Sequence, residues 1–335
     1  MNIPCSNFPD HQRILVAPLN WGLGHASRCI PVIRTLRQLG HEIIIAADAS
    51  PLALLQEEFK DLKRIEFIRF PGLNVSYDKG HVTRSILRHL PAYLLQVRRE
   101  HRRLQELIDS HRISIVISDN RFGLWTRKIP CFYITHQLMI KAPQSLKWSE
   151  WLLYRIHRLV IRRYSECWIP DVKDNGGLSG DLSHRHPLPP NARFIGVLSR
   201  FSILTPQDLK ESDCFHTVAL ISGPEPQRSE FESMVLRELL KRGTKSLILR
   251  GLPDRTETKV VQNVTLVPHL PSRLLMAHLI RARRIICRSG YSTMMDLAVL
   301  HKRAEITPTR GQTEQEYLCN HLVRCNIHDR WLGEL

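Results

Sequence analysis

A histidine follows two glycines near the start of the chain, within the segment NWGLGHASR at residues 20–28. Gly22 and Gly24 let the backbone turn tightly and approach a ligand closely. The helix expected after this turn presents unpaired N–H groups and a partial positive charge to an anion or a sugar oxygen. His25 would project from that helix start, where a neutral imidazole can take a proton from a hydroxyl. The spacing alone leaves two interpretations open, a catalytic base or a histidine that caps a strand-to-helix turn.

A second polar segment, RSGYSTMMD at residues 288–296, also follows an apolar run. Ser289 and Gly290 form a turn into a helix whose first N–H groups suit a phosphate. Asp296 lies one to two turns further along, and its carboxylate could accept both hydrogen bonds of a ribose diol. A capped helix with an ordinary surface acid would show the same pattern, so the local signal favours neither interpretation.

A third polar segment, TPTRGQTEQEY at residues 307–317, forms a loop that runs into a helix. Amide and acid side chains in such a loop could bind the hydroxyls of a sugar. Taken alone, the segment is better explained as an ordinary polar loop.

Short apolar runs alternate with helical patterns along most of the chain. Strands are expected at 13–17, 42–47, 65–70, 113–118, 131–135, 216–222, 245–250, 264–267 and 284–287. The clearest helices are expected at 26–39, 229–240, 272–281 and 292–300. Wholly apolar strands separated by helices are typical of a parallel sheet covered on both faces. The sequence therefore predicts an α/β fold of two Rossmann-like, doubly wound domains that face each other across a cleft.

Glycines and prolines concentrate between residues 171 and 190, as they do in connecting segments. We therefore expect an N-terminal domain at 1–170, an interdomain connection at 171–200 and a C-terminal domain at 201–335. Ligands of such sheets bind at the carboxyl ends of the strands, which is where the glycine turn and the 288–296 segment are expected.

Basic residues outnumber acidic ones in the 335-residue chain, since 48 Lys and Arg against 32 Asp and Glu give a formal net charge of +16. This excess favours anionic partners. Nucleic acid is not expected among them, because no helix-turn-helix, zinc-finger or aromatic RNA-binding pattern is present. No apolar run approaches the roughly 18 residues of a membrane span, and the first residues lack the layout of a signal peptide, so we expect a cytoplasmic protein.

Residues 149–164, SEWLLYRIHRLVIRRY, have the spacing of an amphipathic basic helix. Leucines and isoleucine fall on one face, whereas Arg155 and Arg158 fall on the other. The pattern favours a helix whose apolar face packs on the core. The alternative is an interfacial helix on anionic lipid with Trp148 and Trp151 as anchors, and residues 84–103 are similarly basic.

In order and separation, the three polar segments resemble those of the GT-B-fold nucleotide-sugar glycosyltransferases. The nearest likeness is to glycosyltransferase family 28, whose best-known member adds N-acetylglucosamine to a lipid-linked peptidoglycan precursor. Residues 22–25 resemble the family's N-terminal glycine loop, and 288–296 resemble its Arg-Ser-Gly-x-x-Thr-x-x-Glu donor motif. Residues 315–317 resemble its Gln-Gln-Tyr segment.

The resemblance implies a hexosyltransferase that moves a sugar from a UDP-sugar, bound by the C-terminal domain, to a hydroxyl acceptor on the N-terminal side. His25 would be the general base. No metal or other cofactor is expected, because helix dipoles and backbone donors can stabilise the leaving diphosphate. A lipid-linked acceptor would bring the protein to the inner face of the membrane as a peripheral protein. The implied substrate-binding residues are Asn20, Gly22, Gly24, Arg28, Arg228, Arg288, Ser289, Gly290, Thr293, Asp296, Gln312, Gln315 and Glu316.

Some positions depart from the family pattern. Asp296 stands where the family has a longer glutamate, and Glu316 stands where it has a second glutamine. The loop SGPEPQR at 222–228 replaces a glycine-rich turn, and its two prolines remove two backbone donors. Glu225 adds a charge that repels phosphate, which Arg228 would have to offset.

A second activity fits the same fold. Residues 22–29, GLGHASRC, also resemble the Gly-x-Gly-His-x-x-Arg-Cys turn of nucleotide-sugar hydrolases of the pseudaminic-acid pathway. In those enzymes the histidine activates water in place of an acceptor alcohol. Hydrolysis of a nucleotide sugar therefore stays open as the alternative function.

Overall fold

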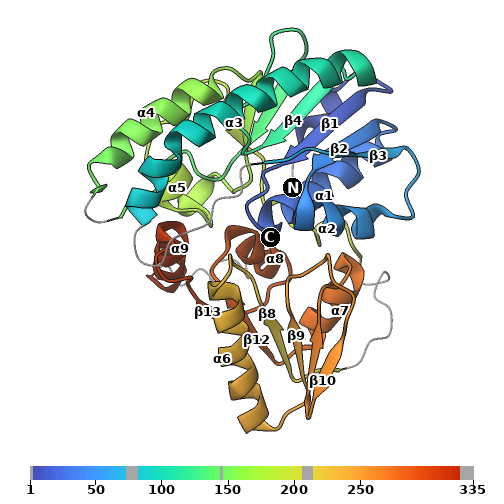
Figure 1. Cartoon of the computed structure of the whole chain (residues 1–335), viewed down its shortest axis with the longest axis vertical. Coiled ribbons are helices and arrows are strands. Elements are labelled where there is room, and N and C mark those ends of the chain that lie inside the picture. Colours follow the sequence, from blue (N-terminus) through green and yellow to red (C-terminus); the bar gives the residue numbers. More distant parts are fainter. Residues whose placement is uncertain (1–2, 73–81, 144–145, 206–213, 325–335) are drawn as a thin grey trace.

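The computed structural model describes residues 3–72, 82–143, 146–205 and 214–324. Figure 1 shows two α/β lobes, an upper one from the first part of the chain and a lower one from the last part. Each lobe is built on its own sheet. The predicted α/β class with two largely parallel sheets is confirmed.

The first sheet consists, within the described residues, of seven parallel strands in the order β3-β2-β1-β4-β5-β6-β7. The order reverses between β1 and β4, and a doubly wound sheet takes its ligands at the carboxyl ends of two such strands. The strand bounds are β1 Arg13–Pro18, β2 Glu42–Ala47, β3 Ile65–Arg69, β4 Ile115–Asp119, β5 Cys131–Ile134, β6 Glu166–Ile169 and β7 Ala192–Phe194. The expected connection at 171–200 thus contributes an edge strand, β7, to this sheet.

The second sheet has the order β10-β11-β9-β8-β12-β13 over the described part of the chain, and β10 alone of these six runs antiparallel to its neighbour. The order reverses between β8 and β12, so the segments that follow these two strands meet at one edge. The bounds are β8 Thr217–Leu220, β9 Ser246–Leu249, β10 Lys259–Val261, β11 Val264–Val267, β12 Arg284–Arg288 and β13 Glu305–Thr307.

The helices cover the faces of both sheets (Figure 1). Helix α1 begins at Leu23, three residues before its expected start, so His25 lies in its first turn. The helix bounds are α1 Leu23–Gln38, α2 Ala49–Phe59, α3 Val82–His111, α4 Ser149–Ile161, α5 Asp181–His184, α6 Gln227–Arg242, α7 Ser272–Arg281, α8 Tyr291–Val299 and α9 Thr313–Arg324. The described residues also form two 3₁₀ turns, η1 Pro4–Asn7 and η3 Asp174–Gly176.

The largest of three clusters of buried apolar side chains in the described residues extends through both lobes. It contains Val16 and Ile30 of the first lobe as well as Val218 and Met295 of the second. Because removal of apolar surface from water is the main stabilising contribution, this shared core holds the lobes together.

The expectation that the apolar face of α4 packs on the core was wrong, because that face is exposed to solvent. The buried side chains of the helix include Glu150, Tyr154 and His157, whereas Leu152 and Ile156 are exposed. Polar partners inside the lobe explain this orientation, since buried polar groups must be hydrogen-bonded. The Glu150 carboxylate accepts the N–H of Ala142 at 3.2 Å, and the Tyr154 hydroxyl donates to the carbonyl of Pro187 at 3.0 Å.

Candidate active site

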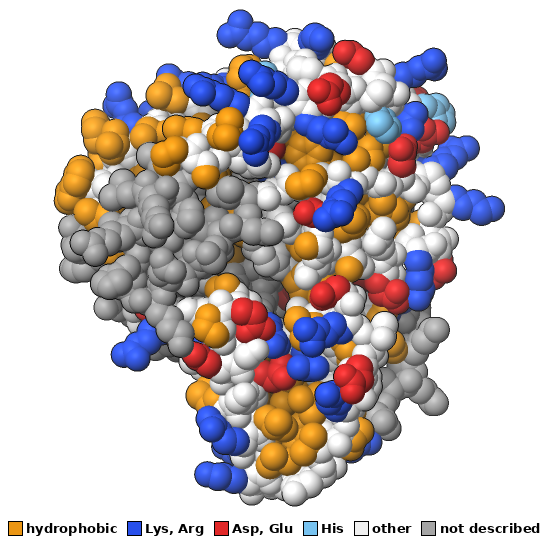
Figure 2. Space-filling view, in the orientation of Figure 1, with side chains coloured by type: hydrophobic (Ala, Val, Ile, Leu, Met, Phe, Trp, Pro, Cys, Tyr) orange, Lys and Arg blue, Asp and Glu red, His pale blue; other side chains and the backbone are white. Residues whose placement is uncertain are grey.

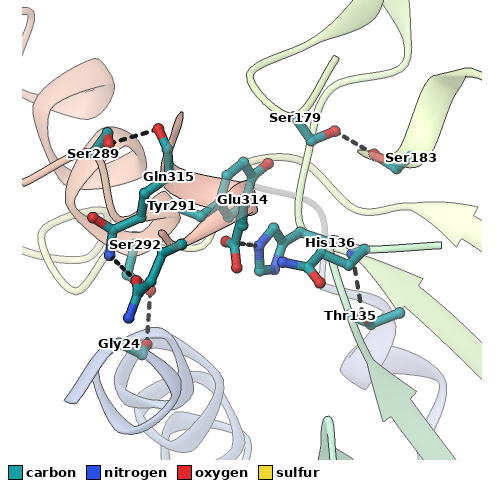
Figure 3. A network of polar contacts seen from close by, with 12 residues as sticks. Gly24, Thr135, His136, Ser179, Ser183, Ser289, Tyr291, Ser292, Glu314 and Gln315 are labelled. Carbon is teal, nitrogen blue, oxygen red and sulfur yellow. Dashed lines mark hydrogen bonds and ion pairs between the residues drawn. The ribbon is translucent and has the colours of Figure 1, made fainter. Parts of the chain in front are cut away.

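The glycine turn after β1 brings the first lobe against the second. Gly22 has a φ of +77°, a conformation that favours glycine, and precedes α1 as its N-cap. The Ser292 hydroxyl of α8 donates to the carbonyl oxygen of Gly24 at 2.8 Å (Figure 3). A Cβ added at Gly24 would lie only 2.9 Å from the Ser292 Oγ. A glycine is therefore required where the two helix N-termini meet.

His25 is paired with an aspartate that was not anticipated from the sequence. Its Nδ1 lies 2.5 Å from Asp119 Oδ1, and Asp119 is the last residue of β4, opposite Pro18 in the register with β1. Asp119 is fully buried, while 15% of the His25 side chain is exposed. Arg28 Nη2 also lies 2.8 Å from this Nδ1, but a carboxylate can only accept, so Nδ1 carries a proton toward Asp119. Nε2 is then the nitrogen that can take a proton.

Arg28 lies behind this pair. Its Nε and Nη2 donate to the two carboxylate oxygens of Asp119, with Nη2 at 2.6 Å from Oδ1. Burial acts to raise the pKa of Asp119, but the charge of Arg28 and the hydrogen bonds from Arg28 and His25 outweigh it and hold that pKa at about 2. Asp119 is therefore a carboxylate at neutral pH. Arg28 itself is only 1% exposed, so the structure places this candidate substrate-binding residue beneath His25.

A histidine of the first lobe continues the network into the second lobe. Arg28 Nη1 lies 2.7 Å from His136 Nδ1. His136 Nε2 lies 2.8 Å from Glu314 Oε1 of α9, as Figure 3 shows. A guanidinium can only donate, so His136 accepts at Nδ1 and donates from Nε2. The Tyr291 ring of α8 stacks on His136 with centroids 4.1 Å apart and planes 5° from parallel.

The charge states of this interlobe contact follow from its burial. Burial lowers the pKa of His136, and Glu314 opposes that change only in part. Burial acts to raise the pKa of Glu314, but His136 outweighs it and the pKa falls below the ordinary range. A neutral imidazole thus donates to a carboxylate.

The segment after β12 forms the second wall of the candidate site. Gly290 is the N-cap of α8 and makes no side-chain cap bond, so the helix start is not covered by a capping side chain. Arg288 Nη1 donates to the carbonyl of Pro308 at 2.6 Å, and its guanidinium lies 4.0 Å from the ring centroid of Phe231. Thr293 follows in the first turn of α8. Such a helix start suits a phosphate, although Arg288 is committed to the backbone and a ring.

The polar residues of the third segment bond to one another and to the second. The Ser289 hydroxyl donates to the carbonyl of Gln315 at 2.8 Å, and Gln315 Nε2 lies 2.6 Å from Gln312 Oε1. Glu316 Oε1 accepts the N–H of Gly311 at 2.8 Å. These bonds shape the loop before α9, and the contact with Ser289 brings Gln315 beside the start of α8 (Figure 3).

Two predicted residues have partners that limit their part in binding. Asp296 is 4% exposed and accepts from Ser199 Oγ at 2.6 Å and from Arg200 Nε at 3.1 Å. Burial raises its pKa, with Arg200 acting against that. Arg228, in the first turn of α6, donates to Glu225 and to Glu232, each at 2.6 Å, so these two carboxylates offset its charge.

Three residues of the network were missed from the sequence: Asp119, His136 and Glu314. Each had a signal, however. Asp119 and His136 follow the apolar runs of two adjacent strands, and Glu314 precedes Gln315 in the third polar segment. Asn20, the remaining predicted residue, lies between β1 and the start of α1.

Comparison with known proteins bears on the first lobe most directly. Residues 12–144 match the model of a family described as glycosyl transferase family 1. An uncharacterized glycosyltransferase of Methanosarcina acetivorans is 25% identical over 203 residues, which cover 56% of this chain and 50% of that protein. The chain thus spans about half the length of the curated relative it matches.

Solved structures resemble the whole chain. Phytolacca americana UGT2, complexed with UDP-2-fluoro-glucose and pterostilbene, has a TM-score of 0.59 at 13% identity over 95% of this chain and 84% of that one. The glycosyltransferase SsfS6 of Streptomyces sp. SF2575, complexed with thymidine diphosphate, has a TM-score of 0.55 at 13% identity over 93% and 86%. The fold is therefore that of the GT-B glycosyltransferases, as expected. The finer likeness to family 28 in residues 288–317 stays a prediction, since the family match ends at residue 144.

Neither a metal site nor a membrane-spanning helix is found among the described residues. No group of three or more His, Cys, Asp or Glu side chains there is arranged to hold a metal ion. In the same ranges, no helix is both long enough and apolar enough to cross a membrane.

Proposed function

We propose that this protein is a glycosyltransferase that moves a hexosyl group from a UDP-sugar to a hydroxyl acceptor, with His25 as the general base. The observation that carries the proposal is the 2.5 Å contact between His25 Nδ1 and Asp119, in a helix turn that meets the N-terminus of α8. A buried carboxylate fixes the imidazole with Nε2 free to accept a proton and stabilises the imidazolium that forms. The family match of residues 12–144 and the GT-B fold support the same activity.

The reaction follows from these positions. The acceptor oxygen attacks the anomeric carbon of the sugar while its proton passes to His25 Nε2, and the bond from that carbon to the diphosphate oxygen breaks. The N–H groups at the start of α8, next to Ser289, Gly290 and Thr293, would stabilise the leaving diphosphate without a metal. Arg28 would act as a positioning residue, because it holds Asp119 and does not face solvent.

The donor would be held by the second lobe. Gln312, Gln315 and Glu316 lie in the loop and helix beside the α8 N-terminus and would bind sugar hydroxyls. Asp296 would bind the ribose, for which its carboxylate must accept a further hydrogen bond besides those from Ser199 and Arg200. Its two oxygens offer about four acceptor sites, of which Ser199 and the side chain and backbone of Arg200 use three, so one remains for a ribose hydroxyl.

The acceptor would approach from the first lobe. We propose a lipid-linked hydroxyl compound, which would make the protein a peripheral one at the inner face of the membrane. The net charge of +16 is consistent with an anionic surface as partner.

The test is an assay of purified protein with a panel of UDP-sugars, each with and without hydroxyl acceptors. Transfer predicts release of UDP that requires the acceptor, and a glycosylated product in equal amount. Stoichiometric loss of donor at the same rate without any acceptor would instead support the hydrolase alternative. Turnover of no nucleotide sugar under either condition would contradict both.

A further inference from the structure

Helix α4 presents an apolar face to solvent. Trp148, Trp151 and Leu159 have exposed fractions of 74%, 59% and 59%, and Leu152 and Ile156 lie on the same side. Contiguous exposed apolar surface of this kind is uncommon on soluble proteins and marks interaction sites. We therefore expect this face to bind a partner.

Polar contacts on the buried side of α4 prevent the helix from rotating to bury its apolar face. His157 Nε2 lies 3.1 Å from the hydroxyl of Tyr133, and its ring stacks on Phe122 with centroids 5.2 Å apart. Burial lowers the pKa of His157 to about 4, so the ring is neutral and stays inside. Turning the helix to bury its leucines would leave these polar groups and Glu150 without their partners.

Exposed arginines lie around this apolar face. Arg155, Arg162 and Arg163 are exposed on or directly after α4, and Lys147 is exposed just before it. The one acid within the helix, Glu150, is buried. Figure 2 shows hydrophobic and basic side chains mixed over the upper left of the molecule, where Figure 1 places α4.

Helix α3 lies near α4 and also carries exposed apolar and basic side chains. Leu94 and Leu95 are exposed, followed by exposed Arg98 and Arg99. Phe122 joins the two helices, since its ring contacts His157 of α4 and lies 5.8 Å from the ring of Tyr93 of α3. We define Trp148, Trp151, Leu152, Ile156, Leu159, Leu94 and Leu95, with the exposed basic residues around them, as the α3–α4 surface.

We propose that the α3–α4 surface binds an anionic membrane. Tryptophan and leucine on one exposed face with arginines beside them fit the boundary between acyl chains and acidic head groups. A second copy of the chain is a poorer occupant, because pairing this surface with itself would bring arginines against arginines. Charge complementarity thus selects an anionic lipid surface.

A row of packed rings beneath the α3–α4 surface reaches the turn that carries the candidate base. Trp21, in the glycine turn beside His25, is 40% exposed, and its ring lies 6.3 Å from that of Tyr93. A row of aromatic rings therefore leads from the His25 turn through Tyr93 and Phe122 to α4. Resting on the proposed function, this arrangement would present the head group of a membrane-anchored acceptor to the first lobe.

The experiment is co-sedimentation of the full chain with vesicles of phosphatidylcholine alone or of phosphatidylcholine with phosphatidylglycerol. Wild type should bind the anionic vesicles and much less the neutral ones, and salt should weaken binding. Replacing Trp148, Trp151 and Leu159 together by serine should reduce binding by at least about tenfold, because the apolar contact with lipid is lost. The change Arg155→Gln should cost about fivefold.

Matched controls come from the second lobe. Met234→Ser with Val260→Ser removes exposed apolar side chains, and Lys241→Gln removes an exposed charge, so all should bind vesicles as wild type does. The proposal is overturned if wild type ignores anionic lipid, or if the triple serine variant binds it equally well. It is also overturned if that variant turns a dimer into a monomer in size-exclusion chromatography, which would make a second copy the occupant.

The two proposals fail separately. On a short, water-soluble acceptor the triple serine variant should keep wild-type turnover, while His25→Ala should keep wild-type vesicle binding. Vesicle binding without transfer would remove the proposed function alone, and transfer without vesicle binding would remove the membrane surface alone.

Discussion

The hydroxyl of Ser292 in α8 donates to the backbone carbonyl of Gly24 in α1 across 2.8 Å, so the helix starts of the two lobes are in direct contact. This contact sets the distance between the turn that carries His25 and the segment expected to hold the donor diphosphate. A hydrogen bond of this kind contributes about 0.5–1.5 kcal/mol. The contact matters more for the positions of the two helix starts than for the stability of the fold.

Gly24→Ala should therefore lower turnover without unfolding the protein. The new Cβ would lie 2.9 Å from Ser292 Oγ, which forces the serine away or the helices apart. The double variant Gly24→Ala with Ser292→Ala removes the crowded hydroxyl and should recover part of the lost rate. Initial rates and melting temperatures of the three proteins decide this. Equal rates for wild type and Gly24→Ala would show that the helix contact does not matter for turnover.

Acid should weaken the contact of His136 with Glu314. Burial lowers the pKa of His136, and the pKa of Glu314 is also below its ordinary range because His136 outweighs burial. Groups with lowered folded-state pKa values bind more protons when unfolded. The stability contributed by His136 should therefore fall as the pH drops below about 6.5, and that contributed by Glu314 as it drops below about 4.3. Burial lowers the pKa of His157 and of His269 to about 4, and both contribute in the same direction.

The part due to His136 is isolated by His136→Gln, whose amide can accept from Arg28 and donate to Glu314. Its melting temperature should fall less than that of wild type between about pH 7 and about pH 5, because the glutamine does not titrate. Parallel curves for the two proteins would contradict the assignment of His136.

Asp119→Ala should destabilise the fold strongly. The change leaves the buried Arg28 guanidinium without its carboxylate partner, a loss worth about 3–5 kcal/mol. The double variant Asp119→Ala with Arg28→Met removes both charges and should be more stable than the single one. Urea unfolding at neutral pH measures the free energy of unfolding of each variant. Glu57→Ala is the control, because it breaks an exposed ion pair with Lys60 and should cost at most about 1 kcal/mol. If the double variant is less stable than Asp119→Ala, the Arg28 charge has another partner in the single variant, which would contradict this prediction.

The fold was predictable from the sequence because its strands are wholly apolar and separated by helical patterns. Ile43 to Ile45 show this well, since both faces of the sheet are covered and all three are buried. The glycine turn was predictable too, because only a few residue types permit the φ of Gly22.

The remainder depends on contacts between distant parts of the chain. Asp119 is 94 residues from His25, and Glu314 is 178 residues from His136, so no local pattern pairs them. The orientation of α4 was misjudged for the same reason. Its hydrophobic periodicity suggested a core-facing leucine stripe, but Tyr133 and Pro187 supply polar partners that only the folded lobe brings to His157 and Tyr154.

Asp296→Ala should weaken UDP binding by about 1–3 kcal/mol, the usual range for a hydrogen bond to a charged group. If Asp296 binds the ribose, a second result should follow. Wild type should prefer UDP to 2′-deoxy-UDP, and the variant should lose that preference. Calorimetric titration with both nucleotides tests it. An unchanged preference in the variant would mean that Asp296 only anchors Ser199 and Arg200.

The most direct test of the whole account is the turnover of His25→Ala beside its affinity for UDP. Loss of the general base should reduce kcat by about 10²–10⁴-fold while the Kd for UDP stays at the wild-type value, since the donor is held by the other lobe. His216→Ala is the matched control, because His216 is exposed and precedes β8 at the edge away from the carboxyl ends. A His25→Ala protein with wild-type kcat, or one that loses UDP binding together with turnover, would contradict the assignment of His25 as the base.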